Sequence, residues 1–93
     1  MRIDDVLWLS EFAEKLAAKH SVTPDEAEQV LRLARRFRRV ERGDRPGEDL
    51  YAADGRTDAG RYLLVYFVLK PGNLTPVVSA RDTTRAERRA YGH

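Results

Sequence analysis

The stretch RYLLVYFVL, residues 61–69, is apolar along almost its whole length and is rich in residues that favour β-structure. An unbroken apolar run of this kind is typical of a strand that is covered on both faces. We therefore predict a central strand here. Lys70-Pro71-Gly72-Asn73 follows it, with Pro and Gly at the two central positions of a type II turn.

Further strands are predicted around the central one. LTPVVSA, residues 74–80, returns after the turn, and because Pro76 has no N–H group to donate, this strand should lie at a sheet edge or contain a bulge. Upstream, residues 37–42 and 49–53 are short strand segments separated by GDRPGE. Turn residues at positions 54–60 then lead into the central strand.

Helical patterns precede and follow these strands. Apolar side chains recur at the spacing of one helix face in residues 9–19. Thr23-Pro24-Asp25-Glu26 is a capping box with Pro at the first helical position, which predicts a second helix over residues 24–35. Thr84-Arg85-Ala86-Glu87 repeats the capping box and predicts a short last helix that ends near Tyr91.

Together these patterns predict one α+β domain that spans residues 1–93. Two N-terminal helices, preceded by a short extended segment at residues 3–8, pack on a four-stranded antiparallel sheet, and a short C-terminal helix follows. A chain of 93 residues supports a single hydrophobic core. Its 42 % hydrophobic and 34 % charged residues are typical of a globular domain rather than a disordered one.

The composition argues against several kinds of site. The absence of Cys excludes disulfides and thiolate ligands, and two histidines, His20 and His93, are too few for a convincing zinc site. We therefore expect no metal and no cofactor. Because no segment resembles a signal peptide or the roughly 20 apolar residues that cross a bilayer, we expect a cytoplasmic protein without membrane contacts.

Arginine dominates the basic residues. Fourteen of the seventeen Lys and Arg residues are Arg, and the charge is uneven, with −4 over residues 1–29 and +6 over residues 30–93. Arg binds phosphate with two parallel hydrogen bonds and stacks on bases, which favours a nucleic-acid partner. The alternative is a GC-rich coding bias, which enriches Arg at every kind of position.

Two segments concentrate these arginines. Residues 31–42 hold six of them, which a strand would divide between its two faces, so a charged edge that prevents aggregation competes with phosphate contact. On the last helix, Arg85, Arg88 and Arg89 share one face, close to Arg81 at the preceding strand end. These guanidinium groups could hold phosphates and offset the charge of a phosphorane, or they could be a solvated surface.

Proton-transfer groups are few. His20 follows Lys19 at the end of the first predicted helix, where it could act as a general base or simply complement the helix dipole. Tyr91 is the least core-like aromatic residue by position. Four more aromatic residues could stack on bases but are more often part of a core: Trp8, Tyr51, Tyr62 and Tyr66.

An ordered set of these residues resembles the BrnT toxins of bacterial type II toxin–antitoxin pairs. The resemblance rests on Lys15, Lys19-His20-Ser21-Val22-Thr23, Glu26-Ala27, Gly60-Arg61-Tyr62-Leu63, Ser79-Ala80-Arg81, Glu87-Arg88 and Tyr91. It implies a RelE-like fold, a ribonuclease activity that inhibits translation, and a cognate antitoxin that carries a ribbon-helix-helix DNA-binding domain.

We therefore predict a metal-independent endoribonuclease toxin that cleaves RNA by attack of a ribose 2′-hydroxyl on the adjacent phosphate. The predicted catalytic residues are His20, Arg61, Arg81, Arg85, Arg88 and Tyr91. The predicted RNA-binding residues are Lys19, Arg61, Arg81, Arg85, Arg88 and Arg89. The alternatives are a non-catalytic toxin-fold module that binds RNA or protein, and a small domain whose arginines serve only as surface.

Overall fold

The apolar run RYLLVYFVL forms strand β4 (Tyr62–Val68), the middle strand of a five-stranded sheet with the order β1-β5-β4-β3-β2. The computed structural model describes residues 3–34 and 36–90 of the chain. Leu63 and Leu64 are neighbours in β4 and point to opposite faces of the sheet, yet both are fully buried. Both faces of β4 are therefore covered, as the unbroken apolar run predicted.

The four predicted antiparallel strands are present. β3 (Leu50–Arg56) and β5 (Leu74–Asp82) flank β4, and β2 (Arg36–Glu41) lies outside β3 at the edge of the sheet. A fifth strand corrects the predicted count: β1 (Asp5–Leu7) pairs in parallel with the start of β5. Three residues are too few to show a strand pattern, so only the extended segment could be predicted from the sequence.

The position of Pro76 decides between the two alternatives for β5. The prediction that β5 is an edge strand at Pro76 is wrong, because β1 pairs with β5 on its outer side and Leu7 lies opposite Pro76. The bulge is present: Tyr66 pairs with Ser79 and Phe67 pairs with Val77, which leaves the residue between them unpaired. Before β5, Gly72 has a φ of 77° in the short 3-10 helix η1 (Pro71–Asn73), as the third residue of a type II turn requires.

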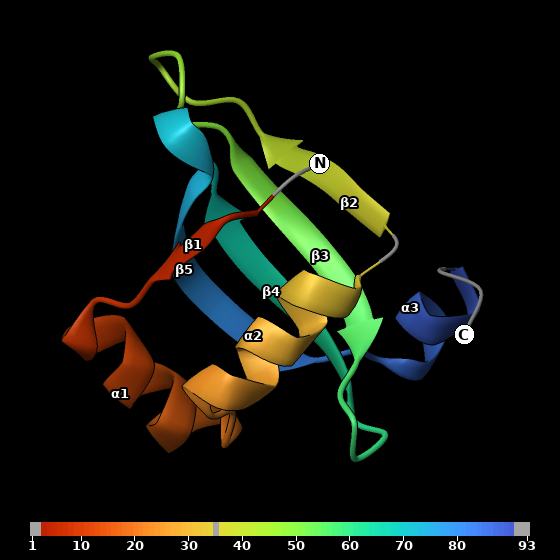
Figure 1. Cartoon of the computed structure of the whole chain (residues 1–93). Helices are drawn as coiled ribbons and strands as arrows, with labels where there is room; N and C mark the ends of the chain where they lie inside the picture. The colour runs from red at the N-terminus through yellow and green to blue at the C-terminus, as the bar shows by residue number, and fades with distance from the viewer. Residues whose placement is uncertain (1–2, 35, 91–93) are drawn as a thin grey trace.

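Helices α1 (Ser10–His20) and α2 (Pro24–Leu33) lie together over one face of the sheet (Figure 1). The predicted capping box of α2 is complete, since the Glu26 N–H donates to Thr23 Oγ1 at 3.2 Å and the Thr23 N–H donates to Glu26 Oε1 at 3.0 Å. The second predicted box also forms, between Thr84 and Glu87, where α3 (Arg85–Ala90) begins. Within the described ranges, no helix is long and apolar enough to span a membrane.

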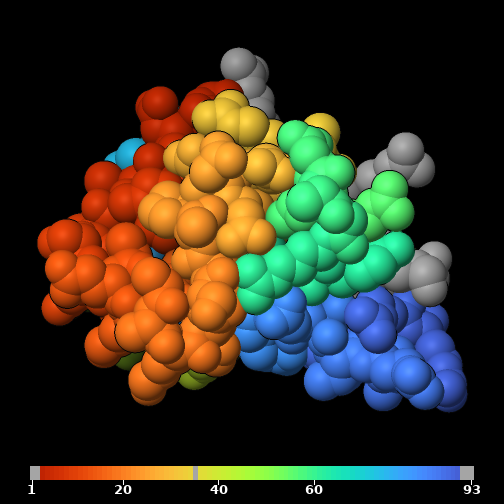
Figure 2. Space-filling model, turned by 90° about the horizontal axis from the view of Figure 1, so that it is seen from below, coloured from red at the N-terminus to blue at the C-terminus, as the bar shows by residue number. Residues whose placement is uncertain are grey.

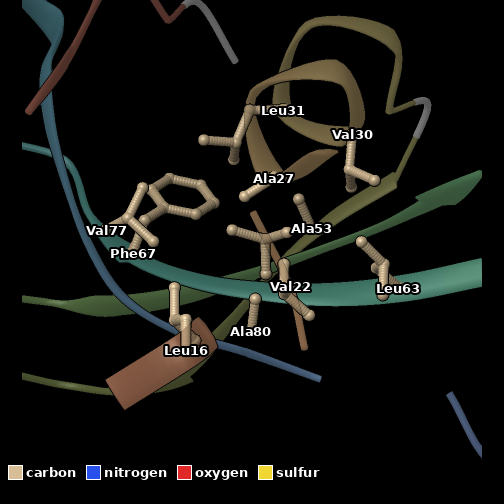
Figure 3. Packing of buried hydrophobic residues seen from close by; sticks show 11 residues of the cluster. Leu16, Val22, Ala27, Val30, Leu31, Ala53, Leu63, Phe67, Val77 and Ala80 are labelled. Carbon is tan, nitrogen blue, oxygen red and sulfur yellow. The ribbon is translucent and has the colours of Figure 1, made fainter. Parts of the chain in front are cut away.

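The hydrophobic core fills the space between the two long helices and the sheet (Figure 3). Phe67 is fully buried in this core and is in contact with two other rings. The Phe37 ring meets it edge-on at 6.0 Å between centroids, and the Tyr51 ring stacks on it at 5.8 Å. The remaining buried members of the cluster come from both helices, their connection and three strands: Leu16, Val22, Ala27, Val30, Leu31, Ala53, Leu63, Val65, Val77 and Ala80.

Candidate functional site

The alternation of side chains along the strands divides the predicted cations between two faces of the sheet. Leu63 belongs to the core under α1 and α2, so Leu64 and its ladder partner Arg81 point to the opposite face. We call this opposite side the arginine face. Its five arginines come from three strands and from α3: Arg36, Arg38, Arg56, Arg81 and Arg88.

Arg81 makes several polar contacts on the arginine face. Its Nη1 and Nη2 atoms donate to the two carboxylate oxygens of Glu87 at 2.7 and 2.8 Å, and Nη2 also donates to the Tyr66 hydroxyl at 3.2 Å. Hydrogen bonding to Glu87 raises the pKa of Arg81 above its ordinary value, and the same pair lowers the pKa of Glu87 to about 2. Arg81 is thus a fixed cation, and 34 % of its side chain remains exposed.

The Tyr62 ring is close to two more arginines of this face. The guanidinium carbon of Arg56 is 5.9 Å from the ring centroid, and that of Arg88 is 5.6 Å away. Arg36 Nη1 donates to the Ala90 carbonyl at 3.4 Å, so the edge strand β2 is connected to the end of α3. Cations from β3 and α3 therefore meet at an aromatic ring, in the kind of arrangement on which nucleobases and phosphates bind.

Arg61 has a different environment, on the helix side of the sheet. Its Nε and Nη2 atoms donate to Asp82 at 2.7 and 3.0 Å, and the guanidinium also contacts Glu26 at 3.3 Å. Two main-chain carbonyls complete the shell, those of Ser21 at 2.7 Å and His20 at 2.8 Å. The structure therefore separates Arg61 from Arg81 and uses Arg61 to join segments of the fold.

Figure 2 shows the end of the molecule where Arg61 makes these contacts, with the orange turn between α1 and α2 against the teal β3–β4 connection and the blue end of β5. The pKa of Asp82 is lowered chiefly by its hydrogen bonds to Arg61. The pKa of Glu26 is lowered first by the Thr23 N–H and then by Arg61. Both carboxylates are therefore charged at neutral pH. With Arg61 they join the turn after α1, the start of α2 and the end of β5, and we call this set of contacts the Arg61 junction.

His20 and Lys19 lie at a third place, in a pocket of about 210 Å³ between α1 and β5. We call it the α1–β5 pocket; its lining residues are Phe12, Lys15, Leu16, Lys19, His20, Val78 and Ser79. One of these residues also belongs to the arginine face, because Ser79 is the ladder partner of Tyr66. The pocket and the arginine face therefore adjoin along β5.

The other predicted site residues belong to the C-terminal segment of the chain. Arg85 and Arg89 are exposed on α3, and Tyr91 lies outside the described residues. Sequence reasoning did not assign Arg36, Arg38 and Arg56 to a site. Their signal is the two-residue period of the strands, which becomes informative only when the buried face is known. In the part of the chain that the structure describes, no three His, Asp or Glu side chains are grouped to hold a metal ion.

Similarity to known proteins is found in structure and not in sequence. No protein family model and no curated protein sequence matches the chain. A structural match is the 1.1 Å crystal structure of the Brucella abortus ribonuclease toxin BrnT, with a TM-score of 0.63 and 17 % sequence identity. The match covers 87 % of this chain and 97 % of the BrnT chain. The predicted resemblance is thus confirmed at the level of structure: this chain has the fold of the BrnT toxin.

Proposed function

We propose that this chain is an endoribonuclease of the toxin type and that its arginine face binds and cleaves RNA. The observation that carries the proposal is the position of Arg81, a partly exposed cation in contact with Tyr66 on the face of the sheet that it shares with the other four arginines. The fold shared with a ribonuclease toxin supports the same conclusion.

The proposed reaction needs alignment and positive charge more than it needs a bound cofactor. The ribose 2′-oxygen attacks the adjacent phosphorus and loses its proton to a base, the bond to the 5′-oxygen breaks, and that oxygen takes up a proton. The products are a 2′,3′-cyclic phosphate and a 5′-hydroxyl. Arg81 would offset the charge on the non-bridging oxygens, and Arg88 would hold the same phosphate or its neighbour.

For proton transfer we propose three candidate groups. His20, with Lys19 as its alternative, and Tyr91 were predicted from the sequence, and Tyr66 joins them because its hydroxyl lies 3.2 Å from Arg81 Nη2. pH–rate profiles measured for His20→Ala, Lys19→Ala, Tyr66→Phe and Tyr91→Phe separate them, since loss of the true base removes the corresponding limb of the profile.

The substitution Arg81→Ala tests the site. We expect cleavage of a 5′-labelled RNA to fall by at least about tenfold, equivalent to roughly 1.4 kcal/mol of transition-state stabilisation. Arg45→Ala, in the exposed loop before β3, is the matched control and should cleave normally. Two-dimensional NMR spectra confirm that both variants are folded. If Arg81→Ala cleaves RNA as fast as the unsubstituted chain, the assignment is wrong.

One observation favours a second candidate function, a module that binds RNA without cutting it. The Nη atoms of Arg81 are already engaged by Glu87, Tyr66 and the Asp82 carbonyl, so a phosphate has to displace a carboxylate to reach them. Such a module would bind RNA with an affinity that falls steeply with salt, and it would produce no cleavage product at any protein concentration. A single gel distinguishes the two functions.

The proposed toxin acts in the cytoplasm, where RNA cleavage inhibits translation, and it is neutralised by a cognate antitoxin with a ribbon-helix-helix DNA-binding domain. A basic surface suits an acidic or amphipathic segment of such a partner. Expression of the chain alone should arrest growth, and co-expression with the neighbouring open reading frame should relieve the arrest. Arrest that persists on co-expression would contradict this pairing.

A further inference from the structure

The α1–β5 pocket combines cationic and apolar walls. Lys15 and Lys19 are one helical turn apart on α1, and His20 follows them. Phe12 and Val78 supply the apolar side, and none of the described residues that line the pocket is a carboxylate. Its volume of about 210 Å³ is below the range of roughly 300–1,000 Å³ that is usual for drug-sized ligands. The pocket therefore suits one small anionic group with an apolar part, such as a single nucleotide.

The pocket is continuous with the arginine face through β5. Ser79 lines the pocket and pairs with Tyr66, and Arg81 lies two residues further along the same face of the strand. Two residues of a strand span about 7 Å, a distance that adjoining nucleotides of an extended chain can bridge. Because α1 covers the other face of the sheet, a chain bound at Arg81 reaches the pocket by passing around the outer edge of β5.

No strand blocks that route among the residues that the structure describes. β1 pairs with β5 only over Leu74–Pro76, and the chain then turns away into α1. The outer edge of β5 beyond Pro76 is left beside the pocket, where Val78 is 36 % exposed. An extended single strand could cross the sheet edge here, whereas a double helix is too wide for a pocket of this size.

We infer that the α1–β5 pocket binds the nucleotide next to the one held on the arginine face. Lys15 and Lys19 bind its phosphate, and the apolar wall at Phe12 and Val78 contacts its base. This inference rests on the proposed function, because it takes single-stranded RNA as the ligand of both surfaces. An acidic segment of a partner protein is the competing ligand, but it would not require the continuity with Arg81 that Ser79 provides.

A 2′-O-methyl-uridine hexamer tests the inference, because it has the phosphates and bases of RNA but cannot be cleaved. We expect its addition to shift the amide NMR signals of Lys19, His20 and Ser79 together with those of Arg81 and Arg88. The double substitution Lys15→Ala/Lys19→Ala should weaken hexamer binding by at least about fivefold. The slope of log affinity against log salt should also fall by roughly 0.7 for each phosphate contact that is lost.

Lys70→Ala is the matched control, because Lys70 is an exposed lysine at the opposite end of β5 and should not affect binding. NMR shifts confined to the arginine face, with unchanged affinity of the double variant, would overturn the inference and point to an acidic protein segment as the ligand of the pocket. Cleavage of unmodified RNA is measured in a separate assay, so a negative NMR and affinity result for the pocket would not contradict the proposed function. Absence of any NMR shift would also overturn the inference, and the proposed ribonuclease activity would then be tested by the cleavage assay alone.

Discussion

Arg61 and Arg81 are the same type of residue but have different roles in this small fold. Arg61 is enclosed by groups of the protein itself, two carboxylates and two main-chain carbonyls from three separate segments. Arg81 contacts one carboxylate, one phenol and one main-chain carbonyl, and 34 % of its side chain is exposed, compared with 27 % for Arg61. The first arrangement stabilises the fold, and the second leaves a cation available for a ligand. Substitutions at the two positions should therefore affect different properties.

Arg61→Ala should lower the stability of the fold. The substitution removes charge-assisted hydrogen bonds to Asp82 and Glu26 and leaves the carbonyls of His20 and Ser21 without their donor. Because the site is partly exposed, we expect a loss of roughly 2 kcal/mol in the free energy of unfolding, or a fall in Tm of about 8–16 °C. Thermal denaturation followed by circular dichroism measures it. A Tm within about 2 °C of the unsubstituted chain would show that the junction is not stabilising.

Glu87→Gln should strengthen RNA binding. Glu87 holds Arg81 through two hydrogen bonds, in the position where a phosphate would bind with the same geometry. Gln at this position keeps the capping box of α3 but removes the competing negative charge. We expect RNA affinity, measured by fluorescence anisotropy, to rise by about threefold or more.

The matched control is Glu26→Gln, which changes the corresponding capping residue of α2, on the helix side of the sheet. It should reduce stability through Arg61 but leave RNA affinity unchanged. Equal RNA affinities for Glu87→Gln and the unsubstituted chain would mean that Glu87 and RNA do not compete for Arg81.

At the scale of elements, α2 and α3 begin in the same way. Each starts with a Thr-x-x-Glu capping box whose Glu also binds an arginine from a strand or its approach, Glu26 with Arg61 and Glu87 with Arg81. The two helices differ in what else holds them. α2 buries three residues in the core, whereas α3 has six residues and none of them is buried. A helix that short is not stable by itself, so polar contacts determine whether α3 forms.

Acid should therefore weaken the attachment of α3. The pKa of Glu87 is lowered to about 2 from an ordinary value of 4.5, so its contribution to stability is fully present above pH 4.5 and is lost as the pH falls toward 2. The pKa values of Glu26 and Asp82 are also lowered, which gives the same sign at the Arg61 junction. Carbon-detected NMR of the Glu87 carboxyl group and of α3 amides, between pH 5 and pH 2, follows the change. Amide signals of α3 that are constant over this range would contradict the expectation.

At the scale of the whole molecule, local signals predicted most of the elements but not their assembly, and the turn predicted at Asp54-Gly55 is wrong because both residues lie within β3. The capping boxes at Thr23 and Thr84, the turn at Gly72 and the apolar run of β4 are all encoded within a few residues, and each predicted its element. The pairing of β1 with β5 joins segments about 70 residues apart, so no local pattern reveals it. The separation of Arg61 from Arg81 could not be predicted for the same reason, because it depends on which face of β4 and β5 the helices cover.

Neighbouring arginines of the edge strand test whether the arginine face acts as one surface. Arg38 pairs with Ala52 of β3 and points to the arginine face. Arg39 pairs with Tyr51 and points to the helix side, where its Nη1 atom is 3.6 Å from Asp49 Oδ2. If RNA lies across the arginine face, Arg38→Ala should weaken RNA binding by about threefold at low salt. It should also lower the slope of log affinity against log salt by roughly 0.7, the value for one phosphate contact with a single strand.

Arg39→Ala is the control, because it removes the same charge one residue away and should leave the affinity and the salt slope nearly unchanged. Fluorescence anisotropy between 50 and 200 mM NaCl measures them, and equal effects of the two substitutions would mean that RNA senses the net charge of the chain rather than this face.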